Sequence, residues 1–397
     1  MKLYIFSVNM SFVLALKLNL ILQMKNHMKK FAGLIVCLWF TITVAFTQNP
    51  QDILIPYRKG TKWGFVDKNK KQVLEPKFDN LWYLQDGLAK AQKGLKWGFV
   101  DKLGKTVVKF KYDGVELFSE GLAVVKSSGL EDEMDEEDDA SELYGFVDKT
   151  GKEVIPLKYE DAVSFKEGFA AVKSGGKWGF VDKTGKEVVP LKYSYAYQFS
   201  EGMARVKLGK KWGFVDATGK EIIACQYEDA GNFSNGLAPV KLNGKWSFID
   251  KTGKEIIPPR YEDAQSFSEG LAGVKLNGKW GFIDKNSKDV ILFKYEAVKP
   301  FSEGMAGFKE NGKWGFFDKT GKKIVNPKYD EVGEFHEEMA SVESIKGKGI
   351  GFIDKTGKEV IPCKYENHSQ FIQGIAFVKL NGKGGYIDKK GNTYWED

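Results

Sequence analysis

From about residue 53 to the end of the chain, short runs of alternating apolar and polar residues recur between turn-forming residues. One unit is Lys177–Tyr193, KWGFVDKTGKEVVPLKY, and its first phrase begins again 34 residues later at Trp212. Alternation with a period of two is typical of β-strands, and no segment shows a convincing helical period. A fixed repeat of this length indicates a repeat architecture. The pattern therefore predicts an all-β chain built from one recurring unit.

Two turn signals divide each unit. The first is Asn-Gly, as at Asn243-Gly244, which suits a two-residue hairpin turn with positive φ at both central positions. The second is Asp-Lys-Thr-Gly-Lys, as at Asp182–Lys186, where the carboxylate can accept local backbone N–H groups and Gly adopts the left-handed conformation. Together they predict an antiparallel three-stranded meander, for example over Leu271–Leu276, Lys279–Asp284 and Asp289–Tyr295.

The strands and connectors carry recurring residues. The third strand contains proline in several units, as at Pro190, so it is predicted to be an edge strand. The connector that follows carries one aromatic residue per unit: Phe118, Phe165, Phe199, Phe233, Phe267, Phe301, Phe335 and Phe371. In the middle strand, Trp178 and Phe180 point to one face and Val181 to the other, so both faces need a cover that neighbouring units must supply.

The unit is counted by the aspartate that closes the Trp-Gly-Phe-Val-Asp phrase. These aspartates predict ten units and are Asp67, Asp101, Asp148, Asp182, Asp216, Asp250, Asp284, Asp318, Asp354 and Asp388. The tryptophan column holds Trp63, Trp97, Trp178, Trp212, Trp246, Trp280 and Trp314, with Tyr144, Ile350 and Gly384 in the third, ninth and tenth units. Insertions of thirteen and two residues precede Tyr144 and Ile350, which indicates an exposed turn there.

Two arrangements of the ten units are compatible with this pattern. We expect an open, curved solenoid or superhelix, because propellers usually have about four to eight blades of four strands. A β-propeller-like closure is the alternative.

Residues 1–48 form a leader with a different composition. It carries five lysines and no acidic residue, and Lys29-Lys30 precede an apolar run over Phe31–Phe46, as in a signal peptide. We expect translation to start at Met28 and cleavage to occur near Thr47–Asn49. An uncleaved membrane anchor and lipidation at Cys37 are the alternatives. Residues 49–397 then hold the ten units, with an acidic insertion at about 130–142.

Charge and composition exclude several functions. The formal net charge is +7, but the leader carries +5 of it, so the repeats are nearly neutral and do not favour nucleic acid as a partner. Only two histidines, His336 and His368, lie outside the leader, so zinc binding and acid–base catalysis are poorly supplied. Cys225 and Cys363 occupy one column four units apart, and no disulfide is expected.

Three features could carry chemistry, and each also has a structural interpretation. The turn aspartates could bind a metal, but adjacent lysines favour turn capping. Carboxylate pairs such as Glu228-Asp229 could suggest a glycosidase, but a recurring pair is more typical of architecture. The acidic run Glu131–Asp139 lacks the ligand spacing of a calcium loop. We expect no metal, no cofactor and no enzyme activity.

The aromatic residues are a second candidate for function. The tryptophan column could form a ladder for sugar rings, or it could be core, since a buried tryptophan contributes a large apolar area per unit. Its position in the strand between Gly and Phe favours core. Trp82 and Trp395 lie outside the column and are expected to be more exposed.

The phrase at Lys177–Tyr193, followed by Phe199-Ser200-Glu201-Gly202, resembles the bacterial WG repeat over about 345 residues. The resemblance implies a secreted, periplasmic or cell-surface β-rich array and carries no catalytic motif. We therefore expect an exported, non-catalytic scaffold that binds a protein or a component of the cell envelope and is not embedded in the membrane after cleavage. A carbohydrate-binding protein is the alternative. Function is expected where the units differ.

Overall fold

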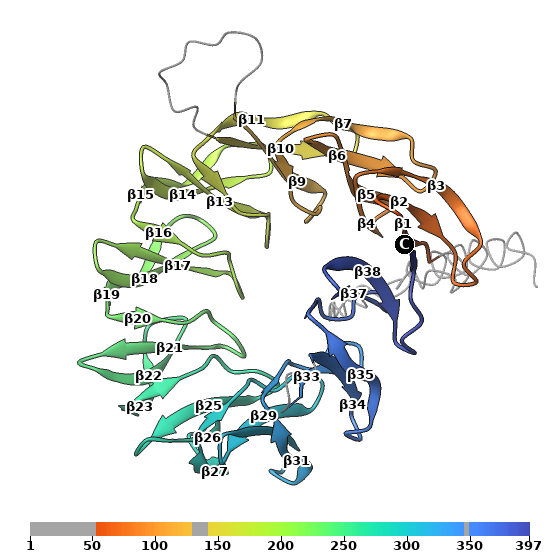
Figure 1. Ribbon diagram of the computed structural model, residues 1–397. Coiled ribbons are helices and arrows are strands. Elements are labelled where there is room, and N and C mark those ends of the chain that lie inside the picture. Colours follow the sequence, from red (N-terminus) through yellow and green to blue (C-terminus); the bar gives the residue numbers. More distant parts are fainter. Residues whose placement is uncertain (1–52, 129–141, 345–348) are drawn as a thin grey trace, which may run out of the picture. The chain divides into compact units, whose positions relative to one another are not determined.

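The computed structural model describes residues 53–128, 142–344 and 349–397 (Figure 1). These residues form strands and turns, and none of them belongs to a helix able to cross a membrane. The predicted leader (1–48) and the acidic run Glu131–Asp139 lie outside the described residues.

The described residues form ten small sheets arranged in a ring, which is a β-propeller. We call the sheets blades 1 to 10 in chain order. In blades 2 to 9 the chain runs from an inner strand through two central strands to an outer strand. Figure 1 shows the outer strands β15 and β19 on the outside of the ring and β13 and β17 nearer its centre.

The strand bounds follow the repeat. Inner strands are β4 (Asn80–Gln85), β8 (Gly114–Val115), β12 (Asp161–Ala162), β16 (Tyr195–Ala196), β20 (Asp229–Ala230), β24 (Asp263–Ala264), β28 (Ala297–Val298), β32 (Glu331–Val332), β36 (Asn367–His368) and β39 (Trp395–Glu396). The first central strands are β1 (Ile55–Lys59), β5 (Leu88–Lys93), β9 (Leu122–Ser127), β13 (Phe169–Ser174), β17 (Met203–Leu208), β21 (Leu237–Leu242), β25 (Leu271–Leu276), β29 (Met305–Glu310), β33 (Met339–Glu343) and β37 (Ile375–Leu380).

The second central strands carry the tryptophan column. They are β2 (Lys62–Val66), β6 (Lys96–Asp101), β10 (Leu143–Asp148), β14 (Lys177–Asp182), β18 (Lys211–Asp216), β22 (Lys245–Asp250), β26 (Lys279–Asp284), β30 (Lys313–Asp318), β34 (Ile350–Asp354) and β38 (Lys383–Asp388). Outer strands are β3 (Gln72–Phe78), β7 (Thr106–Tyr112), β11 (Glu153–Tyr159), β15 (Glu187–Tyr193), β19 (Glu221–Tyr227), β23 (Glu255–Tyr261), β27 (Asp289–Tyr295), β31 (Lys323–Tyr329) and β35 (Glu359–Tyr365).

The predicted meander is confirmed, because the turn residues adopt the conformations that their types require. Asn243 and Gly244 have φ of 50° and 74°, as a two-residue hairpin turn demands. The three strands predicted over residues 271–295 match β25, β26 and β27 at both ends.

The outer strand is an edge strand, as its prolines predicted. Its pairing with the central strand is irregular: Trp178 pairs with Tyr193, but Phe180 pairs with Val189. This bulge contains Pro190 and brings the outer backbone against Gly179, where a Cβ atom would collide with the Val189 carbonyl. This close backbone approach favours glycine in the repeated phrase, although blade 6 holds the small residue Ser247 in the same column, 4% exposed.

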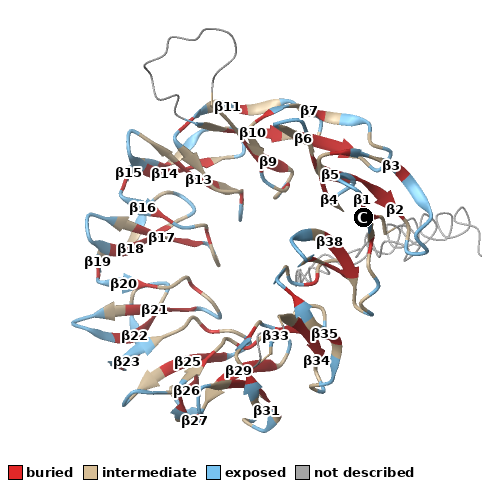
Figure 2. Cartoon of the chain, in the orientation of Figure 1, coloured by how far each residue is buried: buried red, intermediate tan, exposed pale blue. Residues whose placement is uncertain are grey.

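The hydrophobic core is divided among the interfaces between blades. One cluster joins Trp178, Phe180 and Val189 of blade 4 to Ala204 and Val215 of blade 5. Equivalent clusters follow around the ring, and Figure 2 shows buried residues concentrated in the strands and exposed residues at the turns. Neighbouring units thus cover each other, as the two apolar faces of the middle strand predicted.

Two features differ from the preferred expectation. The connector contributes a short inner strand, so blades 2 to 9 have four strands and not three. The array is also closed. The alternative expectation, a β-propeller-like closure, is therefore confirmed, and the preferred expectation of an open solenoid is wrong. A two-residue strand has no detectable periodicity, so the sequence pattern predicts only three strands per unit. Three strands are fewer than a propeller blade usually has.

Residues from both ends of the repeat region close the ring. Inner strand β39 pairs in parallel with β1 of blade 1, and Arg58 Nε donates to the Gly384 carbonyl at 2.7 Å. On the neighbouring blades, Gln373 Nε2 donates to the Leu84 carbonyl at 3.0 Å. One core cluster contains Tyr57 of blade 1 and Tyr386 of blade 10. We call this junction of blades 10, 1 and 2 the seam.

Candidate functional site

The tryptophan column has a folding role. Trp63, Trp178, Trp212, Trp246 and Trp314 are at most 9% exposed, and Trp97, Trp280 and Tyr144 are half-buried against the blade interfaces. The prediction that this column is core is confirmed, and its indole faces do not form an exposed ladder. Trp82, outside the column, is 37% exposed, as expected, whereas Trp395 is half-buried.

The aspartate column caps the second turn of every unit. In blade 4, Asp182 Oδ1 accepts the backbone N–H groups of Thr184 and Lys186 and the Thr184 hydroxyl at 2.6–3.1 Å. The same two backbone contacts recur at all ten predicted aspartates. The threonine hydroxyl bond is the largest cause that lowers the pKa of the Asp182 carboxyl. Turn capping is therefore the role of these carboxylates.

In several units the lysine after the aspartate makes a contact that the sequence did not suggest. Lys183 Nζ lies 3.0 Å from a carboxylate oxygen of Glu120, which belongs to the connector of the preceding blade. The same pairing joins Lys251 to Glu201 and Lys319 to Glu269. These glutamates also accept a backbone N–H from the next connector, so a repeated polar contact joins successive blades.

The carboxylate pairs of the connectors likewise have backbone partners. Glu228 accepts the N–H of Gly244 in the hairpin turn at 3.1 Å, and Asp229 accepts the N–H of Ala230 at 2.8 Å. Among the described residues, no group of three or more His, Cys, Asp or Glu side chains could hold a metal ion. Cys225 and Cys363 are free thiols in different blades, and burial raises the pKa of each thiol.

One pair of positions in each blade holds different residues from unit to unit. The residue after the inner strand donates its backbone N–H to a residue of the first central strand, and we call these two residues a rim pair. The rim pairs are Glu116–Val124, Val163–Ala171, Tyr197–Arg205, Gly231–Pro239, Gln265–Gly273, Lys299–Gly307, Gly333–Ser341 and Ser369–Phe377. Trp82 and Lys90 hold the same columns in blade 2, and Lys90 Nζ lies 5.0 Å from the Trp82 ring centre. The repeated fold thus presents a different chemical pair on each blade.

Cavities open where the tryptophan column is interrupted. Tyr144 lines a cavity of about 210 Å³, Ile350 one of about 180 Å³ and Gly384 one of about 440 Å³. Each residue is smaller than tryptophan, so it leaves unfilled space beside a rim pair. The expectation that function lies where units differ therefore has a physical basis.

The two histidines outside the leader line one cavity of about 550 Å³, together with Lys299 and Glu334. His368 occupies a column that holds valine at Val298 and Val332. Burial lowers the pKa of His368, and its Nδ1 has no hydrogen-bond partner in the described part of the chain. We call this the histidine cavity. Their spacing of 32 residues, nearly one unit, was the sequence signal that could have placed both on adjacent blades.

The cavity at Gly384, which we call the seam cavity, is mainly aromatic. Trp63, Trp82, Tyr83, Phe377 and Tyr386 line it, with Arg58, Asn80 and Gln370 among the polar residues. Ser369 and Gln370 line both the seam cavity and the histidine cavity. The two cavities therefore lie on either side of one loop of blade 10 and form a composite site over blades 8 to 10, 1 and 2.

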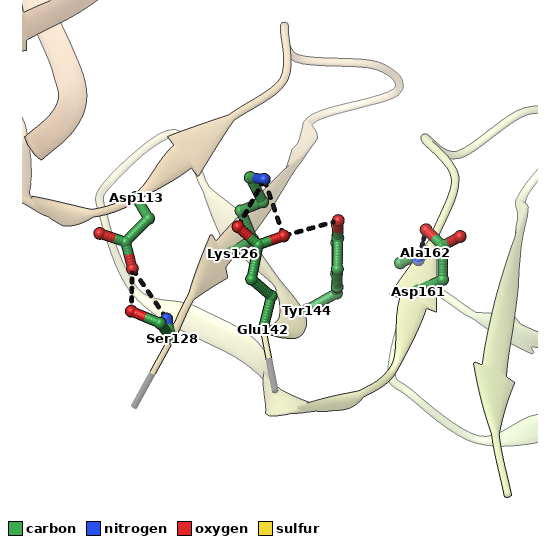
Figure 3. Close-up of polar contacts among 7 residues, drawn as sticks. All are labelled: Asp113, Lys126, Ser128, Glu142, Tyr144, Asp161 and Ala162. Carbon is green, nitrogen blue, oxygen red and sulfur yellow. Dashed lines mark hydrogen bonds and ion pairs between the residues drawn. The ribbon is translucent and has the colours of Figure 1, made fainter. Parts of the chain in front are cut away.

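Lys126 and Tyr144 line the third cavity, and Figure 3 shows the polar contacts around them. Lys126 Nζ lies 2.8 Å from Glu142, whose carboxylate also accepts the Tyr144 hydroxyl at 3.4 Å. Asp113 accepts both the backbone N–H and the hydroxyl of Ser128. These contacts fix the chain on both sides of residues 129–141.

Comparisons with known proteins agree with the repeat architecture. The family profile "WG containing repeat" matches nine times, at residues 63–97, 97–130, 144–178, 178–212, 212–246, 246–280, 280–314, 314–348 and 350–383. The comparison of the sequence with curated proteins gives no match.

Solved structures are similar to this chain at low sequence identity. A crystal structure of the eukaryotic initiation factor has a TM-score of 0.53 and 13% identity, and the similarity covers 83% of this chain and 98% of that chain. Kluyveromyces lactis Hsv2p and a streptogramin B lyase have TM-scores of 0.37 and 0.31, with 9% and 16% identity, over 59% and 53% of this chain and 96% and 85% of theirs. At these identities the first of them supports the fold alone.

Proposed function

The chain belongs to the family of WG containing repeats, and because its own recurring residues have folding roles, we propose that it is a non-catalytic binding protein. Its partner is a protein or a component of the cell envelope. The partner contacts the composite site over blades 8 to 10, 1 and 2. The single observation that carries this proposal is that two cavities, of about 550 and 440 Å³, adjoin one another where the tenth unit departs from the repeat.

The chemistry of the composite site supports binding. The histidine cavity offers Lys299, Glu334 and two imidazoles, and the seam cavity offers aromatic faces. Small-molecule and anchor sites usually have cavities of about 300–1,000 Å³ with few convergent polar groups. Lys299 is itself ion-paired with Glu331 at 2.7 Å, so the site does not present an isolated cation to a nucleic acid.

Export is part of the same proposal and rests on the leader sequence. A basic start followed by the apolar run Phe31–Phe46 favours secretion with cleavage near Thr47–Asn49. The protein would then act in the periplasm, at the cell surface or outside the cell. Expression of the full chain in a bacterium, followed by fractionation and N-terminal sequencing, tests this. A cytoplasmic protein with an intact leader would contradict it.

Binding is tested by sedimentation of the purified protein with bacterial envelope fractions. A variant with Lys299→Ala and Trp82→Ala changes the rim residue on each side of the composite site. We expect it to lose most of the co-sedimentation. A control with Tyr197→Ala and Gln265→Ala changes the same column on blades 5 and 7 and should bind like the unmodified protein. Equal loss in both variants, or no binding by the unmodified protein, would refute the proposal.

A further inference from the structure

The geometry of the seam cavity points to a specific class of ligand, and this inference rests on the proposed binding function. We propose that the seam cavity binds a neutral pyranose sugar, as a free saccharide or as one residue of a glycan.

Aromatic walls of the cavity suit the C–H face of a sugar ring. Tyr386 lies at the centre of the aromatic set, with its ring centre 6.0 Å from Trp63 and 5.5 Å from Phe377, both in edge-on geometry. Trp82, 6.4 Å from Tyr83, is 37% exposed and offers the open aromatic surface at the cavity. Aromatic faces gain dispersion contacts and remove apolar surface from water when a flat ligand stacks on them.

Polar groups of the cavity suit hydroxyls. Tyr386 lines the cavity and is 6% exposed. The side chains of Asn80 and Gln370, which also line the cavity, make no hydrogen bond within the described chain. Amides and phenols both donate and accept, as sugar hydroxyls do, so a saccharide can satisfy all three. A purely apolar occupant would displace water from the Tyr386 hydroxyl without replacing its hydrogen bonds, at a cost in free energy.

Charge in the cavity favours a neutral ligand. Its one formally charged lining residue, Arg58, is 7% exposed and already occupied. The guanidinium donates to the carbonyls of Gly384 and Gly60 and to the Asp397 carboxylate at 2.6–3.1 Å. It is therefore a structural group of the seam, and the described lining of the cavity holds no other charged side chain for an acidic sugar or a phosphate; Lys90, whose Nζ lies 5.0 Å from the Trp82 ring centre, is not among the lining residues.

The seam cavity exists because the tenth unit departs from the repeat. In blades 7 and 8 one residue of the rim pair is glycine, and the second central strand carries the tryptophan, Trp280 or Trp314. In blade 10 the tryptophan is replaced by Gly384, and the Phe377 ring lies where a Cβ atom of residue 384 would be. A smaller aromatic side chain thus replaces the indole, and space for a ligand remains.

Calorimetric titration of the purified protein with neutral saccharides tests the inference. The probes are glucose, galactose, mannose, N-acetylglucosamine and their α- and β-linked disaccharides, with tryptophan fluorescence as a second readout. We expect at least one probe to bind with one site per chain and to change the emission. Trp82→Ala should weaken binding at least about tenfold. Tyr386→Phe, which keeps the packed ring and removes only the hydroxyl, should weaken it about three- to tenfold.

Tyr197→Ala is the matched control, because Tyr197 holds the same column as Trp82, is also 37% exposed and has a cationic neighbour, Arg205. It should leave saccharide affinity unchanged. The inference would be overturned if no neutral probe bound, or if N-acetyltryptophanamide or uronic acids bound more tightly than the neutral saccharides. Saccharide binding at about ten sites per chain would also overturn it. Envelope binding that persists without any saccharide binding would sink this inference alone, whereas loss of both would sink the proposed function as well.

Discussion

Blade 7 and the seam show what regularity and departure each contribute. At the interface between blades 6 and 7, Phe248 of blade 6 and Phe267 of the connector of blade 7 are fully buried and pack edge-on, with ring centres 5.1 Å apart. At the seam, Phe377 is half-buried beside a cavity of about 440 Å³, and a charged side chain, Arg58, connects the blades. Repetition thus fills each interface with the same aromatic contact. Departure from repetition gives a less filled interface with polar groups and space.

In this protein, the residues that recur from unit to unit have folding roles, whereas the residues of the proposed binding site differ between units. Tryptophan, glycine and aspartate recur in most units because they have folding roles there. His368 and Gly384 differ from the recurring residues of their columns, Trp82 holds a variable rim position, and all three line cavities. Closure of the ring then brings the irregular tenth unit beside the first two.

The largest expected effect is the loss of a regular aromatic contact. Phe248→Ala should lower the free energy of unfolding by about 3–5 kcal/mol, because a closely packed interface collapses poorly around the void. Phe377→Ala at the seam should cost only about 1–2 kcal/mol, since that ring is already partly solvated. Urea denaturation of both variants measures the difference. Equal losses would show that the seam is as tightly packed as a regular interface.

The charged contact at the seam is expected to have the next largest effect. Arg58→Ala removes three hydrogen bonds of a buried guanidinium and should cost about 2–3 kcal/mol. Lys241 occupies the same column in blade 6 and makes no such side-chain bonds among the described residues. Lys241→Ala should therefore change stability by less than about 0.5 kcal/mol. Thermal unfolding of the pair provides the measurement, and a similar shift in both would contradict closure through Arg58.

One irregular residue of blade 9 should respond in the opposite direction. Glu338 has φ of 70° at a position where the other described connectors have glycine, such as Gly304 with φ of 84°. Glu338→Gly should stabilise the protein by about 1 kcal/mol, because glycine adopts this conformation without steric cost. Gly304→Glu is the reciprocal variant and should destabilise by a similar amount. If Glu338→Gly were destabilising instead, its side chain would have a role that backbone strain does not explain.

The smallest effect is a dependence on pH. Burial lowers the pKa of His368 from the ordinary value of 6.5, so the unfolded chain binds a proton more readily than the folded one. The resulting loss of stability is absent above pH 6.5, grows as pH falls through that value and is complete below the folded pKa. For this half-buried group it should be about 0.5 kcal/mol or less.

His368→Val, which restores the residue of Val298 and Val332, should remove this slope between pH 7 and 5 and leave the slope below pH 4.5 in place. Denaturation midpoints measured at half-unit intervals of pH give both slopes. An unchanged slope above pH 5 would assign the dependence to other groups.

Local structure was predictable, and closure was not. Asn277-Gly278 and the following aspartate turn fixed the ends of β25, β26 and β27, because these turn types admit few residues. Burial of Trp178 and Phe180 followed from the two apolar faces of the central strand. The inner strands escaped prediction because two residues carry no period. The pairing of β39 with β1 depends on residues more than 330 positions apart, for which one sequence offers no signal.

The candidate site was predictable only in part. Replacement of tryptophan by Gly384 was visible in the sequence, but its proximity to Trp82 required the closed ring. The ion pairs of the turn lysines were also not predicted, because their partners, such as Glu120 for Lys183, lie on another blade.

The central claim is that departure from the repeat at the seam creates the binding site. Gly384→Trp combined with Phe377→Gly restores the pair found in blade 7, Gly273 with Trp280, and should fill the seam cavity without loss of stability. Co-sedimentation of this variant with envelope fractions is the most direct measurement. The account predicts that binding falls to background while the unfolding midpoint is unchanged or raised. A stable variant that binds as well as the unmodified protein would contradict it.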